Sequence, residues 1–283
     1  MSIGVVGRKE IEASLRALGG RDDAAIDIGE AALALAALDR PGVSLDRYRH
    51  ELGRIAAATA EAYAAIDDLR GAQRCLAALT RTIVARFEFA GDRQTYDDLQ
   101  NANLMRVIDR QRGLPIALGV LYLHAGRAQG WSIDGLNFPG HFLLRLEADG
   151  ERLIFDPFAD GALVDPAGMR SLLKASSGAG AELSRTHYEP ASNRDILLRL
   201  QNNIKIRLLR AEQTEAALKI IESMLMFAPG RPSLWYEAGL MHSHLGNLRG
   251  ALVALNQCLD IATDPRLRDE VGRMIRSIGN RLN

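Results

Sequence analysis

The stretch "NFPGHFLLRLEADGERLIFDPF", Asn137–Phe158, predicts a β-hairpin. Two runs with a period of two, "HFLLRL" and "RLIFDP", flank the turn sequence "EADG", a pattern typical of paired antiparallel strands. Pairing Leu146 with Glu151 places His141 opposite Asp156, and directly opposed side chains have Cβ atoms about 5 Å apart. The hairpin therefore predicts an imidazole and a carboxylate within hydrogen-bonding reach.

The register of this hairpin depends on its turn. The pairing above sets Phe142 opposite Phe155 and Leu144 opposite Leu153 on one face. A tighter turn at Asp149-Gly150 would shift every pair by two residues.

A histidine bonded to a carboxylate is the orienting half of a Cys-His-Asp or Ser-His-Asp triad, because the carboxylate fixes the tautomer and steadies the imidazolium. In papain-like folds the cysteine heads a buried helix, whose dipole lowers the thiol pKa. The run "LPIALGVLYLHAGRAQGW", Leu114–Trp131, is apolar on every face of its first three turns and predicts such a helix. Pro115 suits its first position and Gly130 its end. No Cys, Ser or Thr occurs from Gln111 to Leu123, so the expected helix carries no nucleophile.

Helical patterns precede the hairpin and continue after it. Apolar spacing and capping residues predict helices over Asp22–Arg40, Ser44–Ile66, Ala72–Gly91, Leu104–Arg110 and Asp165–Lys174. The polar stretch before Ala102, with Asp92, Asp97 and Asp98, is interpreted as a solvated loop.

The last third of the chain contains a repeat. The residues at the offsets of the 34-residue tetratricopeptide pattern are Trp235, Gly239, Gly246, Ala251 and Leu255. One period earlier the apolar positions are kept, but Gln201, Lys205 and Glu212 stand in place of the Trp and the glycines. The pattern predicts one good repeat, one degenerate repeat and a capping helix, Pro265–Leu282. Such helix pairs stack on a neighbour or bind a peptide.

Together these patterns predict an α+β chain. A helical N-terminal part leads into a papain-like core, in which the buried helix packs on a small antiparallel sheet. An α-helical region of tetratricopeptide type follows. The predicted domains are residues 1–190 and residues 191–283.

The motifs "RGLP", "PGH" and "FDPF" carry a resemblance to a known family. From about Ala31 to its C-terminus the chain resembles the SirB family of bacterial transglutaminase-like proteins. The resemblance implies a transglutaminase-like core followed by tetratricopeptide repeats. The triad of the wider superfamily is Cys, His and Asp, and His141 and Asp156 match the last two. Counting back from Gly130, the cysteine position implied by the resemblance falls on Pro115.

The candidate site therefore consists of His141 and Asp156, a remnant catalytic dyad, and of residues expected to line its cleft. These cleft residues are Pro115, Asn137, Gly140, Asn101 and Asn103. Asn137 is a candidate oxyanion donor by its position. Asn101 and Asn103 are expected to bond backbone groups at a helix start. Gly140 would let another backbone or a ligand come close.

Composition excludes several classes of function. Lys+Arg and Asp+Glu both number 35, which argues against a nucleic-acid or anionic-membrane partner. Cys75 and Cys258 belong to no CxxC or Cys/His cluster, so neither a disulfide framework nor a zinc site is expected. No apolar run is long enough for a membrane span. The apolar run within "MSIGVVGRKE" is too short for a signal peptide. We expect a cytoplasmic protein without cofactor or metal.

These observations favour a non-catalytic transglutaminase-like protein that acts as a protein-protein interaction or regulatory module. A protein or peptide partner would then bind in the cleft, with the His141–Asp156 pair as its anchor. One alternative is a hydrolase or transferase that uses this pair as a general base without a cysteine. Another is a thiol enzyme that uses Cys75, with both cysteines otherwise expected to be core residues.

Overall fold

The computed structural model describes residues 7–282, and its fold divides into two compact units. The first comprises the described residues up to Ile11 together with Asp23–Leu200. The second comprises Glu12–Asp22 and the chain from Gln201 onward. The domain boundary expected between residues 190 and 191 stays a prediction.

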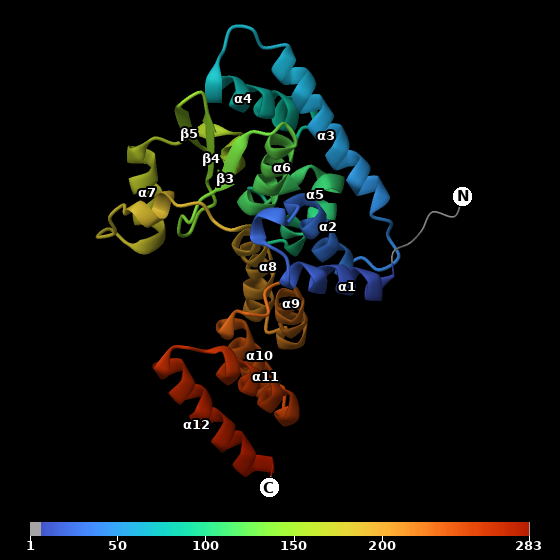
Figure 1. Ribbon diagram of the computed structural model, residues 1–283, viewed down its shortest axis with the longest axis vertical. Helices are drawn as coiled ribbons and strands as arrows, with labels where there is room; N and C mark the ends of the chain where they lie inside the picture. Colours follow the sequence, from blue (N-terminus) through green and yellow to red (C-terminus); the bar gives the residue numbers. More distant parts are fainter. Residues whose placement is uncertain (1–6, 283) are drawn as a thin grey trace. The chain divides into compact units, whose positions relative to one another are not determined.

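The helices and strands are labelled in Figure 1. The α-helices are α1 (Arg8–Gly19), α2 (Ile28–Leu38), α3 (Asp46–Ala64), α4 (Gly71–Thr80), α5 (Leu104–Arg110), α6 (Pro115–Ala128), α7 (Pro166–Ser177), α8 (Asn193–Arg210), α9 (Thr214–Phe227), α10 (Pro232–His244), α11 (Leu248–Ile261) and α12 (Pro265–Leu282). The strands are β1 (Ala90–Gly91), β2 (Arg112–Gly113), β3 (Ser132–Gly135), β4 (Leu144–Ala148), β5 (Glu151–Asp156) and β6 (Ala162–Leu163). Single helical turns are η1 (Asp23–Ala25), the π-helical η2 (Arg81–Arg86), η3 (Leu99–Ala102), η4 (Pro157–Ala159) and η5 (Arg185–Tyr188).

Helix α6 is the centre of the first unit, and every residue from Pro115 to Leu123 is buried. Helices α2 to α5 pack around it, and β3 contacts its other side (Figure 1). The sheet is antiparallel, with strand order β3-β4-β5-β6. The predicted fold class, a buried helix on a small antiparallel sheet within a mostly helical chain, is confirmed.

The predicted register of the hairpin is wrong by two residues. Leu146 pairs with Leu153 instead of Glu151, and Leu144 pairs with Phe155. The turn is the tight Asp149-Gly150, whose φ angles are 52° and 78°. Two-residue turns with positive φ match the twist of the flanking strands, and Asp-Gly adopts them readily. Turn chemistry therefore decided the register.

Two of the predicted helices differ from the structure in their bounds. The expected helix over Asp22–Arg40 begins only at Ile28, because the Asp27 carboxylate accepts the N–H groups of Gly29 and Glu30 at 2.9 and 3.0 Å. The helix expected over Ala72–Gly91 ends as α4 and continues as the π-helical turn η2. Helix α1 and the short strands β1, β2, β3 and β6 were not predicted.

The second unit has the helix pairs and the final helix that the repeat pattern predicted, and α12 spans the predicted Pro265–Leu282. Gly239 allows α10 and α11 to pack closely, since a Cβ there would lie 2.6 Å from the Leu255 Cγ atom. Lys205 occupies the matching position of the degenerate repeat. Its side chain is 8% exposed and forms an ion pair with Glu237 on α10.

Candidate functional site

The structure brings His141 and Asp156 together. His141 Nε2 lies 2.8 Å from Asp156 Oδ2, and the two side chains are 21% and 12% exposed. His141 and Asp156 are not paired across the two strands as expected, because His141 precedes β4 and Asp156 ends β5. Instead, a bend in the chain before β4 brings His141 to Asp156.

The second oxygen of Asp156 is held by the chain that follows it. Asp156 Oδ1 accepts the N–H of Phe158 at 2.8 Å and so caps the turn η4. The N–H of Gly161 donates to the Asp156 carbonyl at 2.9 Å. The FDPF motif therefore folds into a cap that fixes the carboxylate, and the carboxylate in turn orients the imidazole.

The hydrogen bond to Asp156 assigns the tautomer of His141. An ionised carboxylate only accepts, so Nε2 carries the hydrogen in the neutral ring and Nδ1 holds the lone pair. Within residues 7–282 the imidazole makes no hydrogen bond besides the one to Asp156. No Ser, Thr or Cys of this described part of the chain donates to Nδ1, which leaves that nitrogen available to a ligand.

The head of α6 lies close to the His141 segment. The ring of Phe142, the next residue, packs so tightly on Gly119 that a Cβ there would lie 2.3 Å from Phe142 Cε1. Gly119 is about one turn after Pro115, the buried first residue of α6. The preceding Leu114 provides no side-chain cap. Proline supplies neither a nucleophile nor a backbone N–H at this position.

The loop that carries His141 is held on two sides. Gly140 has φ +71°, and Ser176 of α7 lies against it. The Ser176 hydroxyl donates to the Pro139 carbonyl at 3.2 Å. From α8, Arg199 donates to the His141 carbonyl at 2.8 Å. Arg199 was not among the residues singled out from the sequence, since one arginine in an amphipathic helix gives no local sign of its partner.

Asn137 lies at the end of this loop, near the chain that leads to α8. Its side chain donates to the Pro190 carbonyl at 3.3 Å, and its backbone N–H donates to Glu189 at 3.0 Å. The expected role of Asn137 as an oxyanion donor stays a prediction.

Asn103 bonds backbone groups at a helix start, as expected, whereas Asn101 bonds a loop carbonyl and the Arg110 guanidinium. Asn101 donates to the Thr95 carbonyl at 2.6 Å. Asn103 caps α5 by accepting the Arg106 N–H at 3.2 Å and donates to the Ala36 carbonyl at 3.0 Å. Both residues are buried. Their expected contribution to the cleft stays a prediction.

Asp92 is buried, and the expectation of a solvated loop is wrong for this residue. It is 6% exposed and accepts the Thr95 hydroxyl at 2.6 Å and the Arg110 guanidinium at 3.1 Å. The bond from Thr95 is the main cause that lowers the pKa of Asp92 to about 2, and Asn101 and Arg110 contribute to it. The segment after β1 is thereby fixed beside Gly91, whose backbone contacts the Phe158 ring.

Both cysteines are buried and unpaired. Burial, with a smaller contribution from Asp149, raises the pKa of the Cys75 thiol to about 11. Burial also raises the pKa of Cys258. A raised pKa keeps a thiol protonated and unreactive at neutral pH, so both cysteines have the character of core residues.

Neither a metal site nor a membrane-spanning helix is found in the described part of the chain. Within residues 7–282 no group of three His, Cys, Asp or Glu side chains could hold a metal ion. In the same range no helix is long and apolar enough to cross a membrane.

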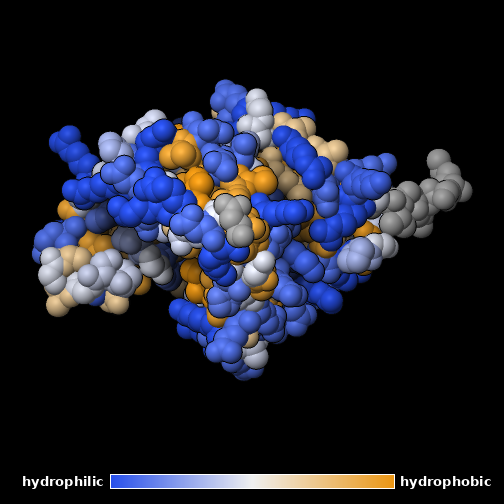
Figure 2. All heavy atoms as spheres, turned by 90° about the horizontal axis from the view of Figure 1, so that it is seen from below, coloured by the Kyte–Doolittle hydropathy of each residue, from blue (hydrophilic) through white to orange (hydrophobic). Residues whose placement is uncertain are grey.

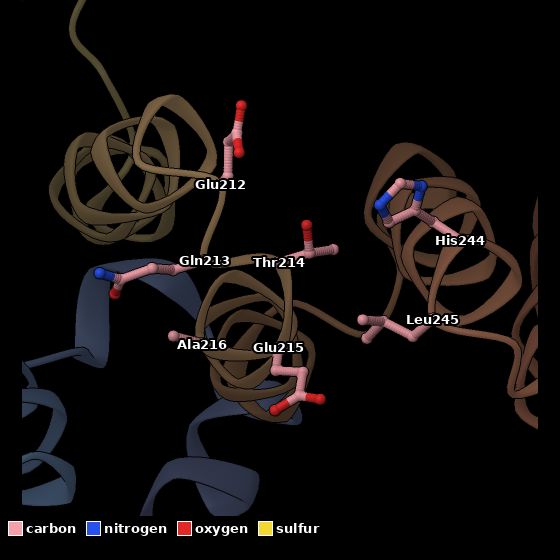
Figure 3. A pocket seen from close by; sticks show the side chains of 7 residues that line it. All are labelled: Glu212, Gln213, Thr214, Glu215, Ala216, His244 and Leu245. Atoms are coloured by element: carbon pink, nitrogen blue, oxygen red, sulfur yellow. The ribbon is translucent and has the colours of Figure 1, made fainter.

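The second unit has a hollow of its own, with a volume of about 440 Å³. It lies between the turn that joins α8 to α9 and the end of α10. Glu212 lines it from the turn, Thr214 from the start of α9 and His244 from α10, whereas the Gln213 side chain points away (Figure 3). This unit also exposes large hydrophobic side chains, among them Val253 at 64%. On the face of the molecule in Figure 2, hydrophobic atoms gather among hydrophilic ones.

Comparison with known proteins agrees with both parts of the fold. A family model of the transglutaminase-like superfamily matches residues 46–202, and a tetratricopeptide-repeat model matches residues 204–276. A UPF0162 protein of Vibrio cholerae is 32% identical over 222 residues, which cover 78% of this chain and 81% of that protein. The chain belongs to the UPF0162/SirB1 family. The resemblance seen in the motifs RGLP, PGH and FDPF is thereby confirmed.

Other UPF0162/SirB1 proteins match over shorter and longer spans. The UPF0162 protein YchA of Escherichia coli is 26% identical over 251 residues, covering 88% of this chain and 90% of that protein. Protein SirB1 of Salmonella typhimurium is 25% identical over 179 residues, covering 63% of this chain and 66% of that protein. These names describe a family and no reaction, so function has to be argued from the site.

Proposed function

We propose that the chain is a non-catalytic transglutaminase-like protein that acts as a protein-protein interaction or regulatory module. Residues 1–190 would provide the binding cleft and residues 191–283 a second contact region. One observation carries the proposal. The His141–Asp156 pair is oriented by the bond between the two side chains and by the bond from the Phe158 N–H to Asp156, but the helix that would present the nucleophile begins at Pro115.

Pro115 fails to meet two requirements of acyl transfer. Acyl transfer through a covalent intermediate needs an activated Ser or Cys beside the imidazole. It also needs N–H donors aimed at the oxyanion that forms. Pro115 supplies neither, and the raised pKa of Cys75 argues against a thiolate from α4. The cleft is therefore better suited to holding a ligand than to attacking it.

The chemistry of the pair favours a peptide ligand. Nδ1 of His141 can accept a hydrogen bond from a backbone N–H, while Asp156 keeps the ring in one orientation. Apolar surface adjoins the FDPF motif. Tyr96 is 43% exposed and packs edge-on against Phe158, and Leu163 of β6 is 60% exposed. Exposed apolar side chains of this kind are typical of surfaces that bind peptides.

The repeats add a second reason to expect a protein partner. The match to tetratricopeptide repeats suggests protein-protein interaction, since stacked helix pairs of this kind present extended binding surfaces.

Panning a random peptide library on the full-length protein tests the proposal. Selected peptides are expected to bind the wild type and to lose roughly tenfold or more in affinity to His141→Ala, the effect of removing an anchoring hydrogen bond and its ring contacts. His124→Ala is a matched control, because the His124 side chain is 19% exposed and lies 4.0 Å from the carboxylate of Asp27. Affinities that His141→Ala leaves unchanged would refute the assignment of the cleft.

A second candidate function is a general-base enzyme. The observation in its favour is the free lone pair on Nδ1, which could take a proton from water or from a substrate hydroxyl. A panel of amide, ester and isopeptide substrates tests it with wild type against His141→Ala. Turnover that the substitution abolishes would support this candidate, and equal rates would end it.

A further inference from the structure

We propose that Arg199 is a positioning residue, which fixes the loop that carries His141 and thereby the orientation of the imidazole. The proposal deepens the function proposed above, because it concerns how the same cleft is kept in shape. The residue that holds the loop would then belong to α8, a helix outside the hairpin.

The guanidinium of Arg199 binds three backbone carbonyls of one loop. Its Nη1 donates to Leu136 at 3.0 Å, and its Nη2 donates to Phe138 at 3.0 Å and to His141 at 2.8 Å. The planar fork of an arginine is suited to binding several acceptors at fixed angles. Three acceptors within six residues leave the loop little freedom around this side chain.

The same guanidinium also stacks on the loop. It lies over the ring of Phe142, 5.2 Å from the ring centre, a cation–π contact that gains strength when water is excluded. Burial lowers the pKa of Arg199. A buried cation is costly unless hydrogen bonds compensate its lost hydration, so the loop and Arg199 stabilise each other.

The position of Arg199 is set by how α8 begins. The carboxylate of Asp23 accepts the N–H groups of Asn193 and Arg194 at 2.7 and 3.0 Å. This contact fixes the first turn of the helix, less than two turns before Arg199. On the other side of the loop Gly140 contacts Ser176. The segment is thus held between two helices, and Arg199 binds the carbonyl of His141 itself.

The contact of Arg199 with His141 affects the hydrogen bond between His141 and Asp156. The Nε2–Oδ2 distance is 2.8 Å, and a shift of about 1 Å would take it beyond hydrogen-bonding range. The Asp156 carboxylate is held by the Phe158 N–H, so the distance depends on the position of the His141 backbone. Arg199 holds that backbone in place. Because α8 runs as one helix from Asn193 to Arg210, displacement of this helix would reach His141 through a single side chain.

NMR of the full-length protein with ¹⁵N-labelled histidine tests the proposal without any ligand. In the wild type, the hydrogen on Nε2 of His141 is expected to exchange slowly, because it is bonded to Asp156. In Arg199→Met the exchange is expected to be roughly tenfold faster, the effect of one lost charge-assisted hydrogen bond. The ¹⁵N shifts are expected to move toward an average of both tautomers.

Arg74→Met is the matched control. Arg74 is also a partly buried arginine. Its guanidinium donates to the Tyr63 carbonyl at 3.1 and 2.9 Å and lies over the Tyr63 ring, 4.1 Å from the ring centre. It makes none of the contacts that Arg199 makes to the loop. In Arg74→Met the His141 signals are expected to match the wild type. The same change in both variants would mean a general loss of structure and would overturn the positioning role.

Unchanged His141 signals in Arg199→Met would also overturn it. If this variant does not fold, Arg199→Lys decides the question, because a lysine keeps the charge but cannot bind all three carbonyls in the same geometry. Wild-type signals in Arg199→Lys would then refute the proposal. The measurement needs no partner, so failure to find a peptide ligand would leave its result unaffected.

Discussion

Gly140 and Ser176 are in such close contact that a Cβ atom at position 140 would lie 2.2 Å from the Ser176 Cβ atom. Gly140 also has φ +71°, a conformation that costs other residues about 1 kcal/mol or more. We predict that Gly140→Ala lowers the free energy of unfolding by about 2 to 4 kcal/mol, because backbone strain and steric overlap add. Denaturant unfolding measures this loss.

Gly150→Ala separates the two causes. Gly150 has φ +78° but no atom near its Cβ position, so this variant is expected to lose only about 1 kcal/mol. Ser176→Gly in the Gly140→Ala background removes the overlap and is expected to recover part of the loss. Equal losses in the two alanine variants would show that the contact with Ser176 is unimportant.

Asp92 is expected to make stability depend on pH. Its pKa is lowered to about 2 in the folded protein, against about 3.9 in an unfolded chain. The ionised carboxylate therefore stabilises the fold above about pH 4, and this contribution disappears as the pH falls through about 2. We predict that Asp92→Asn costs about 1 to 2 kcal/mol at pH 7, with some of the effect lost to solvent screening.

The measurement is the difference in unfolding free energy between wild type and Asp92→Asn from pH 7 down to the acid limit of the folded state. The difference should shrink as the pH falls. Asp97→Asn, in the same loop, is the control for a general charge effect. A difference that stays constant with pH would contradict the lowered pKa.

Removing Glu237 is expected to cost more stability than removing Lys205, its partner in the ion pair. Lys205 is 8% exposed and Glu237 is 35% exposed. Glu237→Gln leaves a buried ammonium without its counter-charge and should cost about 2 to 4 kcal/mol. Lys205→Met leaves a carboxylate that can turn to water, and should cost about 1 kcal/mol or less. Urea unfolding of both variants, with exposed Lys219→Met as control, tests this order, and the reverse order would contradict it.

Cys75 is expected to be inert toward alkylation. A pKa of about 11 leaves roughly one thiol in ten thousand ionised at pH 7. Mass spectrometry after iodoacetamide treatment should find Cys75 unmodified in the folded protein and labelled in denaturant. Labelling of the folded protein as fast as that of a free cysteine would restore the thiol-enzyme alternative.

Local sequence patterns identified the frame of the site. The apolar run from Leu114 predicted the buried α6, and the period of two predicted the hairpin. The contact of His141 with Asp156 was predicted from a register that proved wrong. It forms because a bend before β4 returns the imidazole to the end of β5. The prediction held because His141 and Asp156 lie near the same end of the hairpin, and they stay close when the register shifts by two residues.

Contacts between distant segments could not be predicted in this way. Arg199 and His141 are 58 residues apart, and neither shows its partner in a local pattern. Asp92 was interpreted as solvated because acidic residues crowd its loop, but Arg110 and Asn101 of the following segment enclose it. Such burial depends on how helices pack, which a hydrophobic period along one segment does not report.

We propose that the protein binds peptides at His141 and leaves them unchanged. The most direct test is mass spectrometry of a peptide library after incubation with the wild-type protein and with His141→Ala. We expect the wild type to retain a subset of peptides at their original masses and His141→Ala to retain roughly tenfold less of that subset. Cleaved or cross-linked peptides that appear with the wild type and not with His141→Ala would contradict it and show an enzyme.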